Sequence, residues 1–127
     1  MDAKGKFEVK TEPQQDAVPA GRLLLDKVFH GGLEGTSKGQ MLSAMGGVKG
    51  SGAYVAIETF TGTLDGRAGT FSLYHSGVMQ GGTASLTVTV VPDSGTGELS
   101  GLTGTMEIDP GAGHAYVFHY TLPVAPH

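Results

Sequence analysis

Glu58 and His75 are the ionisable residues whose spacing best suits acid–base chemistry. They lie on either side of Asp65-Gly66, and Asp-Gly between two alternating runs is a strong signal for a two-residue type I′ hairpin turn. That turn fixes a register in which His75 faces Ala56. Glu58 and His75 then become diagonal neighbours on one face, about 7–8 Å apart at Cα. A carboxylate and an imidazole so placed are candidates for acid–base catalysis or for hydrogen bonds to a ligand.

The face that Glu58 and His75 share is apolar, which makes it the inner face of the predicted fold. It also carries Phe60, Leu64, Phe71 and Leu73. Because an unpaired buried charge is costly, we expect both side chains to point inward and to contact each other directly or through one water. The alternatives are that the two groups only satisfy each other, or that the ends of a barrel leave them hydrated. A register slip of one residue would separate them.

A second set of candidate site residues is aromatic or heteroaromatic. Tyr54 shares the face of Glu58, and the last predicted strand carries four rings on one face, at His114, Tyr116, Phe118 and Tyr120. Such rings can line a pocket with their polar tips inward. The candidate ligand-binding residues are Tyr54, Phe71, His114, Tyr116 and Tyr120. Ordinary aromatic filling of the core is the alternative.

Metal binding requires three or four converging ligands. His114 and His119 point to opposite faces of a strand, and the chain has no cysteine. His30 could join Glu58 and His75 only if the second predicted strand lies beside the fourth. We therefore predict no metal site and no cofactor.

The elements that must position these residues are short strands. The chain has 22 glycines among 127 residues, and they separate runs rich in Val, Thr, Phe and Tyr, which favour strands. The predicted strands are at about 5–11, 22–30, 36–46, 53–64, 67–78, 83–92, 102–109 and 114–122. Residues 36–46 could instead contain a helical turn. Loops are predicted at 12–21 and at 92–101, the second with one helical turn at Glu98-Leu99.

Alternation gives each strand one buried and one solvated face, as in an antiparallel sheet. This pattern predicts a single all-β domain over residues 1–127, a closed antiparallel eight-stranded β-barrel, because closure removes exposed edges. Glycines inside strands favour closure by permitting bulges and strong coiling, at Gly62, Gly69, Gly77 and Gly104. The expected core residues include Phe71, Leu73, Leu86, Val88 and Phe118.

The second half of the chain resembles a known family. The segments GTLDGRAGTF (62–71), HSG (75–77), GG (81–82) and VVPDSGTGELSGLTG (90–104) are similar to the domain-of-unknown-function family 3224. The resemblance extends from KFEV (6–9) to the last predicted strand and is loose in residues 32–50. It implies a small bacterial barrel similar to the allene oxide cyclase barrel, and it implies no established activity.

Charge and hydropathy limit the partners. Lys and Arg number 8 against 12 Asp and Glu, a net charge of -4, which argues against a nucleic-acid partner. No apolar run approaches the ~20 residues of a membrane helix, and the start has no apolar signal segment. We therefore expect a cytoplasmic protein without a membrane partner, a monomer or small homo-oligomer.

Three functions fit these observations. The first is a lipocalin-like barrel that binds a small apolar or amphipathic molecule, since eight strands can enclose one small ligand. The second is an isomerase or cyclase-type enzyme with Glu58 and His75 as acid and base. The third is a cavity-free interaction or oligomerisation module. A cavity of useful size separates the first two from the third, and activity loss on substitution of Glu58 or His75 separates the second from the first.

Overall fold

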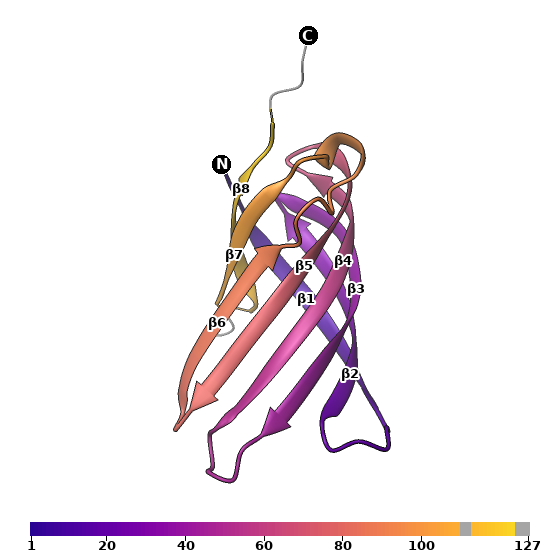
Figure 1. Ribbon diagram of the computed structural model, residues 1–127. Coiled ribbons are helices and arrows are strands. Elements are labelled where there is room, and N and C mark those ends of the chain that lie inside the picture. Colours follow the sequence, from indigo (N-terminus) through magenta and orange to yellow (C-terminus); the bar gives the residue numbers. More distant parts are fainter. Residues whose placement is uncertain (110–112, 124–127) are drawn as a thin grey trace.

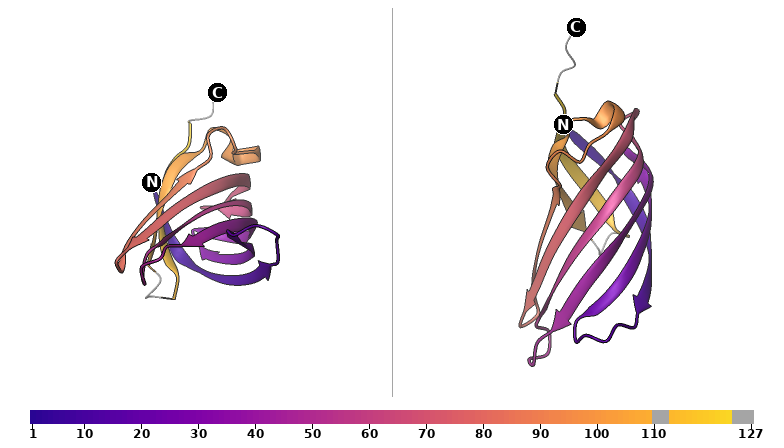
Figure 2. Two further views of the ribbon diagram at one scale, coloured as in Figure 1. Left: turned by 60° about the horizontal axis from the view of Figure 1, so that its bottom comes forward. Right: turned by 45° about the vertical axis from the view of Figure 1, so that its right-hand side comes forward.

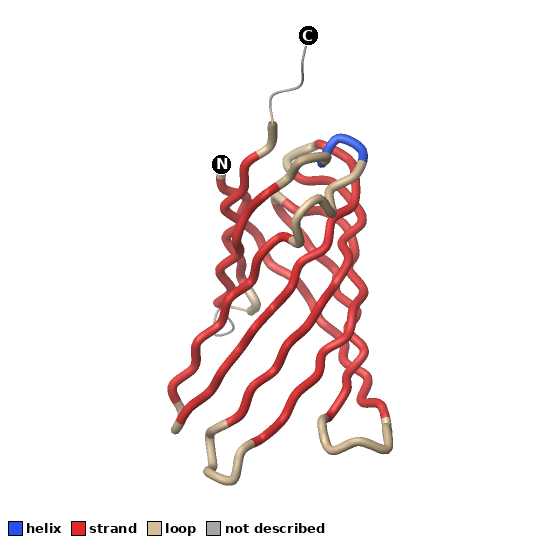
Figure 3. The backbone as a smooth tube through the Cα atoms, viewed as in Figure 1, coloured by secondary structure: helices blue, strands red, loops and turns tan. Residues whose placement is uncertain are grey.

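The computed structural model describes residues 1–109 and 113–123, and its strands form a closed antiparallel barrel in sequence order, with β8 beside β1 (Figure 1). The strands are β1 Asp2–Gln14, β2 Gly21–Gly31, β3 Leu33–Met45, β4 Gly52–Leu64, β5 Arg67–Gln80, β6 Thr83–Val90, β7 Thr103–Asp109 and β8 Ala115–Thr121. Among the described residues the helical structure is one short 3-10 helix, η1 (Gly97–Leu99), at one end of the barrel (Figure 3). The predicted eight-stranded barrel is confirmed.

Two segments differ from the sequence prediction. β1 continues through Pro13 to Gln14, where a loop was expected, and β3 is one continuous strand with no helical turn. Pairing explains both differences, because β1 is hydrogen-bonded to β2 as far as Gln14, and β3 lies between β2 and β4 along its whole length. Pro13 is tolerated because β8 pairs only with the first part of β1, so Pro13 lies on an edge.

The β4–β5 hairpin has the predicted turn and register. Asp65 and Gly66 have φ of 47° and 86°, the positive values that a type I′ turn requires. Pairing is continuous from Leu64 opposite Arg67 down to Gly52, so this hairpin contains no bulge. Gly62 instead permits close approach of neighbouring backbone, since a Cβ there would lie 2.1 Å from a carbonyl oxygen of β3.

One end of the barrel is filled and closed. A row of rings with centroids 5.2–5.7 Å apart crosses it, formed by Phe7, Phe29, Phe60, Phe71 and Phe118. Leu99 of η1 and Leu102 cover this end, and both are buried. The predicted core positions Phe71, Leu73, Val88 and Phe118 are confirmed.

The opposite end is open, and there the core prediction for Leu86 is wrong. Leu86 is on the inner face but is 42% exposed. β6 pairs with β7 only at Thr89 and Thr105. From Thr89 back to the start of β6 at the open end, β7 therefore does not lie beside β6 to cover its inner face. β7 and β8 have 7 residues each, against 13 in β4, and the lower ends of β2–β6 extend beyond them (Figures 1 and 2).

Candidate ligand-binding site

A buried polar cluster lies midway along the inner face of the barrel. Glu58, His75 and Lys27 are 1%, 5% and 7% exposed. Lys27 Nζ is 2.7 Å from Glu58 Oε2, and His75 Nε2 is 3.4 Å from Glu58 Oε1. Glu58 and His75 therefore both point inward and contact each other, as their hairpin register predicts.

Lys27 is the member of this cluster that the sequence reasoning missed. It alternates with Leu25 and Phe29, two residues of the apolar core, and this alternation was the available signal that its side chain points inward. Between β2 and β4 lies Gly39, opposite both Leu25 and Glu58. A Cβ on Gly39 would lie 2.8 Å from Glu58 Cβ, so a glycine is required where Glu58 approaches β3.

The surroundings keep Glu58 ionised. Burial by itself raises the pKa of Glu58, but the contact with His75 and the positive charge of Lys27 outweigh it and hold the pKa below its ordinary value. The Lys27 Nζ also lies 4.8 Å from the ring centroid of Phe7, in a cation–π contact.

The cluster has unused hydrogen-bonding capacity. Both carboxylate oxygens of Glu58 are buried and form ion pairs, with Lys27 and with His75, and neither these oxygens nor His75 Nε2 have a further hydrogen-bond partner. The hydroxyl of Ser37, opposite Lys27 on β3, is in the same state. Buried polar atoms in folded proteins are normally paired, so each such atom calls for an explanation.

Beside the cluster, the open end of the barrel holds a cavity of about 490 Å³. Its walls are mainly inward-facing residues, Met41, Ser43, Met45, Tyr54, Gly77, Met79, Ala84, Leu86 and Ile108. Met41, Ala56 and His75 form one cross-strand row of the inner face, so His75 shares a row with a residue of the cavity wall. The polar cluster therefore adjoins the cavity along the inner face, although its own residues are not part of the cavity wall.

Tyr54 is the one predicted ligand-binding residue that lines this cavity. It faces Gly77 across the β4–β5 pair, and a Cβ at Gly77 would lie 2.2 Å from Cε1 of the tyrosine ring. The Tyr54 ring thus occupies the space that a side chain at position 77 would need, so a glycine is required there.

The other two tyrosines among the predicted ligand-binding residues, Tyr116 and Tyr120, have structural contacts at the closed end. The Tyr116 hydroxyl accepts a hydrogen bond from the Leu33 N–H at 2.9 Å and donates one to the His30 carbonyl oxygen at 2.9 Å. The Tyr120 hydroxyl donates to the Asp65 carboxylate of the hairpin turn. Burial and this carboxylate together raise the pKa of Tyr120 to about 12. Both hydroxyls are therefore hydrogen-bonded within the protein and are not available to a ligand.

Phe71 and His114 also lie away from the cavity. Phe71 is fully buried between the rings of Phe60 and Phe118. His114 precedes β8 and stacks on Phe7 with a centroid separation of 5.0 Å. The structure therefore does not bring these two residues together with Tyr54.

Two further histidines, His30 and His119, face solvent. His30 Nε2 is 3.7 Å from Glu8, and His119 lies between Asp2 and Glu107 on the outer surface. His30 follows the inward-facing Phe29 on β2 and so points to the outer face, away from the inner cluster. Within residues 1–109 and 113–123, no group of three His, Cys, Asp or Glu side chains could hold a metal ion.

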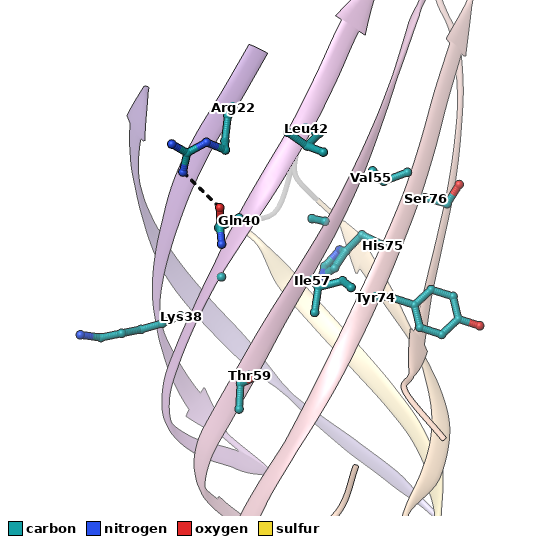
Figure 4. A pocket seen from close by; sticks show the side chains of 12 residues that line it. Arg22, Lys38, Gln40, Leu42, Val55, Ile57, Thr59, Tyr74, His75 and Ser76 are labelled. Atoms are coloured by element: carbon teal, nitrogen blue, oxygen red, sulfur yellow. Dashed lines mark hydrogen bonds between the residues drawn. The ribbon is translucent and has the colours of Figure 1, made fainter. Parts of the chain in front are cut away.

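A larger hollow, of about 830 Å³, lies on the outer surface over β2–β5 (Figure 4). Apolar side chains exposed by 40–60% line it, at Leu42, Val55, Ile57 and Tyr74. Arg22, at its border, is already hydrogen-bonded to Gln40 and Asp16. His75 is the residue of the buried cluster that borders it. We place the candidate site in the inner cavity, because inward-facing residues of the barrel form most of its walls.

Comparisons with known proteins agree with this architecture. A family model described as "Protein of unknown function (DUF3224)" matches residues 3–120. The chain is similar to the crystal structure of a DUF3224-family protein of unknown function from Shewanella oneidensis MR-1, with 46% identity, 98% of each chain covered and a TM-score of 0.92. No curated protein matches the chain. In the described residues no helix has the length and apolar character needed to span a membrane. Because the family model runs from β1 into β8, the chain belongs to the DUF3224 family.

Proposed function

We propose that the protein binds a small apolar or amphipathic molecule in the open end of its barrel. The observation that carries this proposal is the cavity of about 490 Å³ enclosed mainly by inward-facing side chains. Ligand sites typically measure about 300–1,000 Å³ and combine apolar walls with a few polar groups. Here the walls are apolar apart from Tyr54 and the serines Ser43 and Ser85.

The methionines of the open end support an adaptable apolar site. Met41, Met45 and Met79 line the cavity and make up three of the five methionines in the chain. Methionine side chains are flexible and polarisable, so they adjust to ligands of different shape. Met45 is 73% exposed and Met79 is 42% exposed, and a bound molecule would remove this apolar surface from water.

Access to the cavity requires no disruption of the closed end. The strands β6 and β7 separate below Thr89 and Thr105, and the described part of β8 pairs with β1 only from Asp2 to Lys6. A molecule can therefore approach the cavity from the open end while the phenylalanine core stays intact.

Acid–base catalysis is the second candidate, and the 3.4 Å contact between Glu58 and His75 favours it. A general base works best when its pKa lies near the working pH. The ion pair with Lys27 contributes to a lowered pKa for Glu58, which makes it a weak base at neutral pH. We therefore place binding ahead of catalysis. A ligand recovered unchanged after incubation supports binding, whereas conversion that stops in Glu58→Gln supports catalysis.

The binding proposal is tested with an uncharged fluorescent probe, N-phenyl-1-naphthylamine. We expect saturable binding at one site per chain, and about tenfold weaker binding in Leu86→Arg, which places a charge on the cavity wall. Leu42→Arg is the matched control, because Leu42 is 47% exposed, close to the 42% of Leu86, but lies on the outer face. Absence of saturable binding, or an equal loss in both variants, would overturn the proposal.

A further inference from the structure

We propose that the ligand carries an uncharged polar end that both donates and accepts hydrogen bonds, with an aliphatic alcohol as the simplest example. Its hydroxyl would bind Ser37, Glu58 and His75, which lie next to the cavity on the inner face, and its apolar chain would extend through the cavity toward the open end. This inference rests on the proposed binding function and adds the chemical class of the ligand.

The first argument is a set of buried polar atoms that have no hydrogen-bond partner beyond the ion pairs of Glu58 with Lys27 and His75. Ser37 Oγ, His75 Nε2 and both carboxylate oxygens of Glu58 are buried and have no hydrogen-bond partner. Ser37 and Glu58 are each 1% exposed, so bulk water does not satisfy them. Leaving such atoms unpaired costs free energy, and a ligand group or a bound water at this place would recover it.

The second argument is position. His75 lies two residues before Gly77 on β5, and Gly39, opposite Glu58, lies two residues before Met41 on β3. Gly77 and Met41 both belong to the cavity wall. Inner-face residues two apart on a strand are separated by about 7 Å, the length of a few bonded carbon atoms. One molecule can therefore reach the cluster with its polar end and the methionines with its chain.

The third argument is charge. Lys27 and Glu58 form an ion pair at 2.7 Å, so their charges already compensate each other. A ligand carboxylate would place a second anion beside Glu58, and a ligand ammonium would place a second cation beside Lys27. Like charges in a site with little water repel strongly. A hydroxyl avoids both conflicts, because it can donate to the carboxylate or the imidazole and accept from Ser37.

The test compares three ligands with the same chain and different ends, 1-decanol, decanoate and decylammonium. Each is titrated against the protein loaded with N-phenyl-1-naphthylamine at neutral pH. We expect decanol to displace the probe at concentrations about tenfold lower than either ion. Equal displacement by the three compounds, or tighter binding of decanoate or decylammonium, would overturn the inference while leaving the binding function intact.

Substitutions on β3 test whether the preference comes from the cluster. Ser37→Ala removes one hydrogen bond to the alcohol, so we expect about fivefold weaker decanol binding with unchanged probe affinity. Ser43→Ala is the matched control, because Ser43 lies on the same inner face and lines the cavity but is opposite Tyr54, whereas Ser37 is opposite Lys27 of the cluster. An equal effect of the two variants contradicts the assignment. Without saturable probe binding to the wild type, the proposed function and this inference both fail.

Discussion

The two ends of this barrel have the same alternating strands but opposite interiors. At the closed end Phe71 and Leu99 are completely buried, whereas at the open end Met45 is 73% exposed and Leu86 is 42% exposed. The cause is strand length, since β7 and β8 have 7 residues each and do not extend along the lower half of β5. Alternation therefore decides which face a side chain is on, and the neighbouring strands decide whether that face is covered.

The polar cluster marks the boundary between the two ends. The chain places Lys27, Glu58 and His75 where the filled core stops and the cavity begins. A buried ion pair contributes little to stability compared with apolar packing. Its position next to the cavity is the reason that we include it in the proposed ligand site.

The largest expected effect is a difference in stability between matched substitutions at the closed end and at the open end. Phe71→Ala should lower the free energy of unfolding by about 3–5 kcal/mol, because it leaves a void in a packed core. Leu86→Ala, also on an inner face, should cost less than about 1 kcal/mol, because its side chain is already partly in water. Urea denaturation of both variants provides the measurement. Similar losses would show that the open end is packed in solution.

The second-largest effect on stability is expected at the polar cluster, which lies between the two ends of the barrel. Lys27→Met removes the cation beside Glu58 and should cost about 3 kcal/mol at neutral pH, because it leaves a buried charge facing only His75. Lys38→Met, at an exposed position on β3, is the control and should have little effect. Denaturation of both variants at neutral pH gives the comparison. A small loss in Lys27→Met would mean that water reaches Glu58.

The same variant carries a prediction for pH. The folded-state pKa of Glu58 lies below its ordinary value of 4.5, so its stabilisation is present above pH 4.5 and is lost as the pH falls through the lowered pKa. Without Lys27, this dependence should shrink, so the stability difference between wild type and Lys27→Met should narrow toward acid pH. Denaturation midpoints between neutral and acid pH measure it, and a difference that does not change with pH would contradict the ion pair.

The smallest effect compares a turn at the closed end with a loop at the open end. Gly66 and Gly47 both have free space where a Cβ would lie, but only Gly66 has a positive φ, of 86°. Gly66→Val should therefore cost about 1–2 kcal/mol through backbone strain. Gly47→Val should cost clearly less. Thermal unfolding midpoints distinguish the two, and equal shifts would show that the Asp65-Gly66 turn does not constrain the hairpin.

The β4–β5 hairpin shows which features of the structure can be predicted from the sequence. Turn chemistry at Asp65-Gly66 and a strand period of two are local properties, and together they set the pairing of β4 with β5. For this reason the inward orientation and mutual contact of Glu58 and His75 follow from the amino-acid sequence. The same local patterns predicted the eight strands and the closed barrel.

Other features depended on which strands became neighbours. Lys27 reaches Glu58 because β3 lies between their strands and has a glycine there, and no local pattern contains that arrangement. The Tyr116 and Tyr120 hydroxyls are bonded to residues far away in the sequence, which removed them from the candidate site.

The strands, the hairpin register and the inner face are properties of the sequence alone, because they follow from interactions between residues close in the chain. The exposure of Leu86 in an open cavity and the place of Lys27 in the cluster were decided by the tertiary structure. Both depend on how far β7 and β8 extend and on the order of strands around the barrel. Whether a side chain is buried depends on the strands that barrel closure brings next to it. Burial is therefore set by contacts between distant parts of the chain.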